Sequence, residues 1–447
     1  MASMITISLY HLADTFWVAK LGPEAIAAIT VTFPFFIATI AFGIGTGVGA
    51  NALASRRFGE RNVEAGNRVA GQVFSLAVLM GAVFIVMTTF FSRQIALICG
   101  ATPDILDMAT DYLWFFGWGV PFLLFRLIIR NVFQASGDAV KPMVFTIISA
   151  VINVILDPFF IFGWGPFPEL GVGGAALATA ISMATGTLIA LYYLLAKKSA
   201  YRLKAHHLVP DFTVIREIYR VGLPSIFMPL TESVVFTLFN RVVAGFGSTA
   251  LAALGIAIRI SDIAFMPIIG VSHGLLPIIG FSFGARLWRR LWSATRLATL
   301  STVVLLVMIT IALEVFAPQL IRIFNDDADL LAVAVPGMRI VMSGLVLVGP
   351  AIIFITTFQG LSRGWTASVL SLGRQLVFFL PALFILPRFL GLNGVWWSLP
   401  LSDALGLLVS GTWLYREYSR HKQGDHWEKT PSAELIPTVP APRIPLD

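Results

Sequence analysis

The chain has 447 residues, of which 57% are hydrophobic and 12% are charged. Soluble globular domains carry roughly a quarter charged residues, so this composition excludes that class and indicates a membrane protein. The formal net charge of +7 does not by itself indicate a nucleic-acid partner, because basic residues of membrane proteins gather in cytoplasmic loops. The single cysteine, Cys99, excludes an intramolecular disulfide and a cysteine-based metal cluster.

Long apolar stretches predict an all-α polytopic membrane protein with twelve spanning helices. Each stretch has about 20 residues or more, enough to cross the hydrocarbon layer as a helix, whereas a β-barrel would alternate over roughly ten residues. The expected spans are 1–19, 25–50, 68–91, 110–133, 142–163, 172–196, 216–243, 249–281, 291–317, 331–358, 366–388 and 394–415. The first barely reaches the required length, so we expect the first helix to be truncated at its N-terminus.

Charged loops predict how the chain is oriented in the membrane. Basic residues follow the second, sixth and eighth spans, and include Arg56, Arg57, Arg61, Lys197, Lys198, Lys204, Arg286, Arg289 and Arg290. Loops on the opposite side carry the acidic residues Asp104, Asp107, Asp326 and Asp327. The positive-inside rule therefore places both termini in the cytoplasm, with the protein in the cell (inner) membrane. The polar, proline-rich residues 418–447 are predicted to form a disordered cytoplasmic tail.

An internal repeat predicts two lobes. A shift of 225 positions pairs Gly45 with Gly270, Gly49 with Gly274, and Phe133-Gln134 with Phe358-Gln359. Six spans repeated in the same order predict lobes of equal orientation, related by a pseudo-two-fold axis along the membrane normal, with a central cavity between them. We expect an N-terminal lobe at 1–196, a basic cytoplasmic linker at 197–215 and a C-terminal lobe at 216–417.

Two acidic residues, Asp14 and Asp157, lie inside predicted spans. A charged Asp near the middle of a spanning helix costs roughly 2.5 to 3.5 kcal/mol, so such a residue normally has a partner, faces a cavity or carries a proton. Asn153 and Asp157 are four residues apart and share one helix face, as do Tyr10 and Asp14. The two pairs are therefore candidates for one polar site, although a helix-end role for Asp14 and a purely structural role for Asp157 stay open.

Proline follows the second acid directly. Pro158 removes a backbone N–H and so predicts a helix kink that frees the carbonyl of Val154 near the carboxylate.

Several segments together resemble one family of transporters. They are Asp14 to Gly22, Ser55 to Gly59, Phe133 to Asp138, the run Asn153-Val154-Ile155-Leu156-Asp157-Pro158, and Gly174 to Thr179. In order and over almost the whole chain they resemble the multidrug and toxic compound extrusion (MATE) family, most closely its bacterial branch named after a DNA-damage-inducible protein. The resemblance implies an antiporter that exports organic, usually cationic, compounds in exchange for H⁺ or Na⁺.

The resemblance also implies which residues couple transport to the ion. The family positions matching Tyr10, Asp14, Asn153, Asp157 and Thr179 form a cation-coupling network in the N-terminal lobe. Such buried carboxyls can hold a proton near neutral pH, and the same oxygens could hold Na⁺ instead.

The C-terminal lobe does not repeat the acids, since the offset pairs Asp14 with Phe239 and Asp157 with Ala382. Coupling is therefore expected to be asymmetric. Glu232 resembles an acidic residue of the Na⁺-linked branch and, with Gln359, is a possible secondary site or cargo contact. That branch also carries an acid where this chain has Thr356, so H⁺ is favoured over Na⁺.

Other interpretations remain. Glu232 could instead pair with Arg241 or Arg259. A flippase or exporter of a lipid-linked or polyisoprenoid-linked substrate is the alternative function, and it would need a strongly basic central cavity. Neither a His-Glu-x-x-His nor an aspartate-rich metal motif is present, so no enzyme, cofactor or structural metal is expected. The expected partners are amphipathic organic cations and lipid, the expected state is a monomer, and the cargo itself is not predicted.

Overall fold

The computed structural model describes residues 17–18, 20–21, 23–195, 201–322 and 328–423. All regular structure within these ranges is helical. Ten of the helical segments are long and apolar enough to cross a membrane, and they correspond to the predicted spans two to eleven. Apart from Trp17 and Val18, which are helical, the predicted first span lies outside the described residues.

The N-terminal lobe contains five described helices. They are α2 (Pro23–Gly59), α3 (Val63–Cys99), α4 (Leu106–Ala135), α5 (Val140–Phe162) and α6 (Gly171–Leu195). Each matches one predicted span, and α2 and α3 are far longer than a bilayer requires. The lobe encloses its own buried apolar clusters, in which Val132, Phe133, Leu123 and Leu124 are almost fully buried.

The C-terminal lobe is more fragmented. Its helices are α7 (Phe212–Ala244), α8 (Ser248–Gly284), α9 (Trp288–Val315), α10 (Ala317–Arg322), α11 (Ala328–Ser343), α12 (Leu345–Gly360), α13 (Gly364–Leu372), the π-helix η2 (Gly373–Phe379), α14 (Leu380–Leu390) and α15 (Leu392–Gln423). The predicted tenth span is thus divided at Gly344, where a Cβ atom would lie 2.9 Å from the Cα of Pro400 on α15. The eleventh span is interrupted by the π-helix.

The last helix corrects one predicted boundary. Residues 418–423 were expected to belong to the disordered tail, but α15 continues to Gln423. Its final turns stay helical because they pack on α9, with Trp292 and Tyr418 in edge-to-face contact and His421 stacked on Trp288. The remainder of the predicted tail lies outside the described residues.

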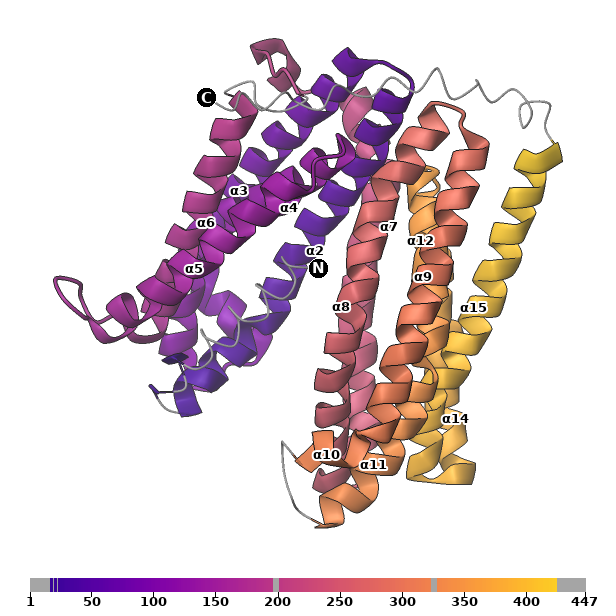
Figure 1. The fold of residues 1–447 in the computed structure, drawn as a ribbon. Helices are drawn as coiled ribbons and strands as arrows, with labels where there is room; N and C mark the ends of the chain where they lie inside the picture. The colour runs from indigo at the N-terminus through magenta and orange to yellow at the C-terminus, as the bar shows by residue number, and fades with distance from the viewer. Residues whose placement is uncertain (1–16, 19, 22, 196–200, 323–327, 424–447) are drawn as a thin grey trace.

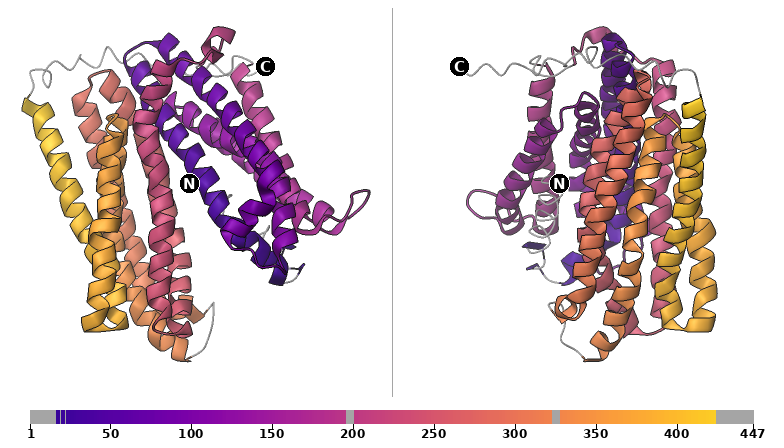
Figure 2. Two further views of the ribbon diagram at one scale, coloured as in Figure 1. Left: turned by 180° about the vertical axis from the view of Figure 1, so that it is seen from behind. Right: turned by 45° about the vertical axis from the view of Figure 1, so that its right-hand side comes forward.

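The two lobes contact each other at one end and diverge at the other. Figure 1 shows α2 to α6 as one bundle and α7 to α15 as a second, and the views in Figure 2 agree. The lobes approach each other at the end that carries the α2–α3 and α8–α9 turns. Across this boundary α2 packs against α7 and α8.

Glycine makes that close approach possible. A Cβ atom on Gly49 would collide with the carbonyl oxygen of Ile218 on α7, and one on Gly59 would collide with that of Phe281 on α8. A Cβ atom on Gly274, the repeat partner of Gly49, would meet nothing within 4 Å. The repeated glycines therefore have different structural roles in the two lobes.

The linker between the lobes is attached to the N-terminal lobe. Gln72 on α3 donates from Nε2 to the carbonyls of His207 (2.8 Å) and Val209 (2.6 Å), and its Oε1 accepts from the backbone N–H of Asp211 (2.8 Å). Tyr201 is buried and donates to a backbone carbonyl of α4 over 2.7 Å. Residues 201–211, which include the short 3₁₀ helix η1 (Ala205–Leu208), therefore belong structurally to the N-terminal lobe.

Three side chains reinforce this attachment. The Oε1 atom of Glu64 lies 2.7 Å from Nε2 of His207 and 3.2 Å from Nε2 of His206. The Nδ1 atom of His207 accepts the backbone N–H of Lys204 over 3.1 Å, so Nε2 carries the ring proton and donates it to Glu64. In this arrangement Nε2 of His207 carries a proton and has no free lone pair. Glu64, His206 and His207 therefore serve to attach the linker to α3.

Candidate functional site

The polar site predicted in the N-terminal lobe is present between α5 and α6. Asn153 and Asp157 lie one turn apart on α5, and both are 0% exposed. The Nδ2 group of Asn153 donates to Oδ1 of Asp157 over 3.2 Å and to Oγ1 of Thr179 on α6 over 3.1 Å. The structure therefore brings together the three described residues of the predicted coupling network.

Small residues on α6 allow this contact. A Cβ atom on Gly174 would collide with the carbonyl of Phe160, and one on Gly186 would collide with the hydroxyl of Ser149. These two contacts flank Thr179 along α6 and hold the antiparallel helices close together. The Gly-Ala-Ala segment that resembles the family therefore places the Thr179 hydroxyl within reach of Asn153.

The site contains buried polar atoms beyond these two bonds. Oδ1 of Asn153 is buried and has no hydrogen-bond donor among the described residues. Pro158 is buried inside α5 and supplies no N–H, so the carbonyl four residues earlier, at Val154, has no donor from the helix backbone there. The site is consequently rich in oxygen atoms that could accept a proton or coordinate a small cation.

Tyr10 and Asp14 lie outside the described residues, but the end of their predicted span is anchored beside α5. The rings of Trp17 and Phe162 are 6.1 Å apart in an edge-to-face arrangement. Val18 and Ile161 are both buried, at 2% and 0% exposure, and belong to one apolar cluster.

The candidate residues of the C-terminal lobe do not form a comparable buried site. Glu232 is exposed on α7. Gln359 on α12 donates to the Ser225 hydroxyl over 3.4 Å, and Ser225 lies about two turns before Glu232 on α7. Thr356, which stands where the Na⁺-linked branch resembled above carries an acid, is buried and lies 2.6 Å from the Ser272 hydroxyl.

Basic residues also lie at the lobe boundary, and none of them was among the predicted site residues. Arg126 and Arg130 are one turn apart on α4, and their charges interact. Arg130 also interacts electrostatically with His273 on α8 of the other lobe. The Nε atom of Arg130 is buried without an acceptor in the part of the chain that the structure describes. These three ionisable side chains lie inside predicted spans four and eight, and this position was the feature of the sequence that could have identified them.

A buried ion pair lies within the C-terminal lobe. Nη1 of Arg374 on η2 is 2.7 Å from Oδ1 of Asp403 on α15, and Asp403 is 5% exposed. Each residue lies inside a predicted span. The free-energy cost of a charged side chain there, which singled out Asp157, could have singled out this pair as well. The pair joins two opposite charges, whereas the hydrogen bond from Asn153 to Asp157 comes from an uncharged amide.

Comparison with known proteins gives the family. The profile of the family described as MatE matches residues 1–159 and 224–384. The chain belongs to the MatE family. As a member of this family of membrane transporters it is not an enzyme. The resemblance to the family found in the sequence is confirmed, and the branch within it stays a prediction.

Similar proteins span nearly the same length as this chain. The Multidrug export protein MepA of Staphylococcus saprophyticus is 28% identical over 403 residues, which cover 90% of this chain and 88% of that protein. MepA of Staphylococcus haemolyticus is 28% identical over 398 residues, covering 89% and 87%.

Solved transporter structures share the fold. An outward-facing multidrug resistance MATE family transporter matches with a TM-score of 0.89 and 27% identity, covering 95% of this chain and 94% of that one. A transporter from Pyrococcus furiosus, described by the reverse polarity of its binding pocket, matches with a TM-score of 0.88 and the same identity and coverage. The predicted two-lobed, twelve-span all-α fold is thereby confirmed.

Proposed function

We propose that this MatE-family transporter is a secondary active multidrug exporter. It exchanges organic, mostly cationic or amphipathic compounds for H⁺ by alternating access between its two lobes. The proposal is supported by the similarity to multidrug export proteins over about nine-tenths of both chains. It works as a monomer in the cell membrane. Its basic loops favour an orientation with both termini in the cytoplasm.

The burial of Asp157 is the observation that carries the coupling proposal. Its carboxyl group is 0% exposed within a membrane-spanning helix, and its hydrogen bond from Asn153 comes from an uncharged amide. Burial penalises the ionised carboxylate, and protonation removes that penalty. Binding and release of one proton would therefore change the charge of the α5–α6 contact and the packing preference of α5 next to Pro158.

The anchored end of the first span supports a role for Asp14 in the same site. Spans one and five are both odd-numbered, so they cross the membrane in the same direction. In the sequence Asp14 precedes Val18 by four residues, as Asp157 precedes Ile161, and Val18 and Ile161 belong to one buried apolar cluster. Tyr10 precedes Asp14 by the same four residues that separate Asn153 from Asp157, which supports the proposal that the two pairs act together.

Transport driven by an imposed gradient tests the proposal. Everted vesicles containing the protein are given a fluorescent cationic dye and either a proton or a sodium gradient. We expect dye movement with the proton gradient alone and its loss in Asp157→Asn. Asp107→Asn, which changes an exposed acid on the α3–α4 side, is the matched control and should behave as the parent. Unchanged transport in both Asp14→Asn and Asp157→Asn would contradict the coupling site.

The same experiment decides the coupling ion. Oxygen atoms of Asn153, Asp157 and Thr179 could bind Na⁺, which prefers such ligands. Equal stimulation by a sodium gradient without a pH difference would replace H⁺ with Na⁺ in the proposal.

The boundary arginines favour a second candidate function, movement of an anionic or lipid-linked substrate. Arg126 and Arg130 give the contacting end of the lobes a basic character, and Arg130 Nε has no acceptor among the described residues. Pairing with phosphate would satisfy such a group. Export of an anionic dye that is lost in Arg130→Gln, together with no export of a cationic dye by the parent, would favour this function over the first.

A further inference from the structure

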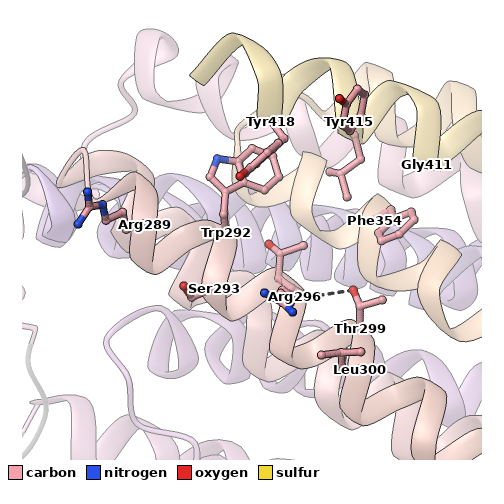
Figure 3. Close-up of a pocket in the computed structure, with 12 residues that line it drawn as sticks. Arg289, Trp292, Ser293, Arg296, Thr299, Leu300, Phe354, Gly411, Tyr415 and Tyr418 are labelled. Atoms are coloured by element: carbon pink, nitrogen blue, oxygen red, sulfur yellow. Dashed lines mark hydrogen bonds between the residues drawn. The ribbon is translucent and has the colours of Figure 1, made fainter. Parts of the chain in front are cut away.

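A groove lies on the C-terminal lobe between α9, α12 and α15, away from the coupling site. Its volume is about 700 Å³. Figure 3 shows Arg289, Trp292 and Arg296 along one wall, from α9, and Tyr415 and Tyr418 on the facing helix α15. α15 lies on the side of this lobe away from the N-terminal lobe (Figure 1), and the groove is open to the outside of the protein at Leu300 and Tyr415, which are 51% and 70% exposed.

The lining changes from charged to apolar along the groove. Arg289 lies near the start of α9, at the end of the molecule that bears the basic loops, and Leu300 lies three turns further along. The two residues are eleven positions apart, which is a rise of about 16 Å along the helix and close to half of a hydrocarbon layer of about 30 Å. Phe354 and Leu414 continue the apolar part. This gradient matches a phospholipid, whose phosphate lies at the interface and whose acyl chain extends inward.

The charged side chains of the groove favour an anionic headgroup. None of the residues lining it is acidic. Arg289 and Arg296 have no carboxylate partner within the described ranges, whereas Glu417, which is close in sequence to the aromatic wall, pairs with Arg363 and Arg420. Two unpaired guanidinium groups attract an anion and disfavour a cationic drug.

The aromatic wall supports the same ligand. Trp292 is 8% exposed and contacts Tyr418 edge to face, with 5.3 Å between ring centroids. Its indole N–H is buried and has no acceptor in the described part of the chain. Tyr415, which also lines the groove, is 70% exposed. Tryptophan and tyrosine side chains concentrate where headgroups meet the hydrocarbon layer.

We propose that this groove is a binding site for an anionic phospholipid. The phosphodiester binds between Arg289 and Arg296, and one acyl chain lies along Leu300, Phe354 and Gly411. Basic pockets between helices at the membrane surface bind lipid headgroups in this way. The lipid would fill the space between α9 and α15 and stabilise the position of α15.

Lipid retention measured by native mass spectrometry tests the proposal. The full-length protein is reconstituted in nanodiscs that contain equal amounts of phosphatidylglycerol and phosphatidylcholine, then released into detergent. We expect about tenfold preference for retained phosphatidylglycerol, lost in Arg289→Gln/Arg296→Gln. The matched control, Arg286→Gln/Arg290→Gln, removes two basic residues of the same region that do not line the groove and should retain the preference.

A second variant separates a lipid from a simple anion. A Cβ atom on Gly411 would lie 3.6 Å from Cε2 of Phe354, so the β-carbon is accommodated and the rest of a leucine side chain would fill the groove. Gly411→Leu keeps both arginines and should lose phosphatidylglycerol while leaving the secondary structure measured by circular dichroism unchanged. Retention in Gly411→Leu, displacement of the lipid by 10 mM inorganic phosphate, or equal loss in the control pair would overturn the proposal.

Discussion

Asn153 donates a hydrogen bond to Asp157 across one turn of α5, with 3.2 Å between Nδ2 and Oδ1. The same amide reaches Thr179, so a single side chain connects the acid to the neighbouring helix. Replacing Asn153 would leave buried oxygen atoms without their donor, which costs about 1 to 3 kcal/mol per group.

The first prediction follows from this bond. Asn153→Leu, which has a similar volume, should lower the free energy of unfolding by about 1 to 3 kcal/mol and reduce proton-driven dye export. Thermal unfolding in detergent and vesicle transport measure the two effects. Ser149→Ala is the control on the same helix, because the Ser149 hydroxyl is buried without a partner among described residues and its removal should change stability little. Equal effects of the two changes would contradict this role for Asn153.

The second prediction concerns the contact between lobes. Gly49→Ala places a methyl group against the carbonyl of Ile218, so α2 and α7 must separate where the lobes meet. We expect a lower unfolding temperature and slower transport, with a greater distance between spin labels across this boundary. Gly274→Ala, at the equivalent position of the repeat, meets open space and should be neutral or stabilising by up to about 1 kcal/mol. A Gly49→Ala protein with parental distances and transport would refute the packing argument.

The third prediction concerns the buried pair Arg374 and Asp403. Arg374→Leu leaves the 5% exposed carboxylate of Asp403 without its cation, and breaking such a pair costs about 3 to 5 kcal/mol. The double change Arg374→Leu/Asp403→Leu should cost less than the single one. Asp107→Asn, which breaks the exposed pair with Arg93, should cost less than about 1 kcal/mol. Thermal unfolding measures all three, and a double variant that loses as much stability as Arg374→Leu, or more, would contradict the coupling.

The fourth prediction concerns pH. Burial lowers the pKa of His421 below 6.5, and the charge of Arg363 acts in the same direction, although Glu417 opposes both. The folded protein therefore favours the neutral ring. As the pH falls through about 6.5, the unfolded chain takes up the proton first, so the stability that this ring contributes is lost.

Unfolding temperatures between pH 7.5 and 5.5 test this linkage. The parent should lose more stability over this interval than His421→Gln, which cannot be protonated. Parallel slopes for the parent and His421→Gln would show that His421 does not contribute.

The sequence alone predicted the parts of this protein that depend on local spacing. The four-residue interval placed Asn153 and Asp157 on one face, and apolar length located the spans. The resemblance added Thr179. The partners of Gly45 and Gly49 could not be predicted, because they lie on α7, more than 160 residues away in sequence, and depend on how the lobes pack.

Two other features could not be predicted from the sequence, for physical reasons. Hydropathy is continuous across Gly344 and η2, so the breaks in spans ten and eleven leave no mark on it. The groove beside Trp292 and Tyr418 depends on the angle between α9 and α15, which no local pattern specifies. The arginines at the lobe boundary were visible as charged groups within spans, but their partner His273 comes from the other repeat.

The attachment of residues 201–211 to α3 also determines how freely the lobes can move. The peptide that leaves the N-terminal lobe at Asp211 enters α7 at Phe212, so no slack chain separates them. A tether this short keeps the lobes at a high effective concentration and restricts them to rotation about the tethered end. The opposite ends, which no peptide joins, are left to travel the larger distance.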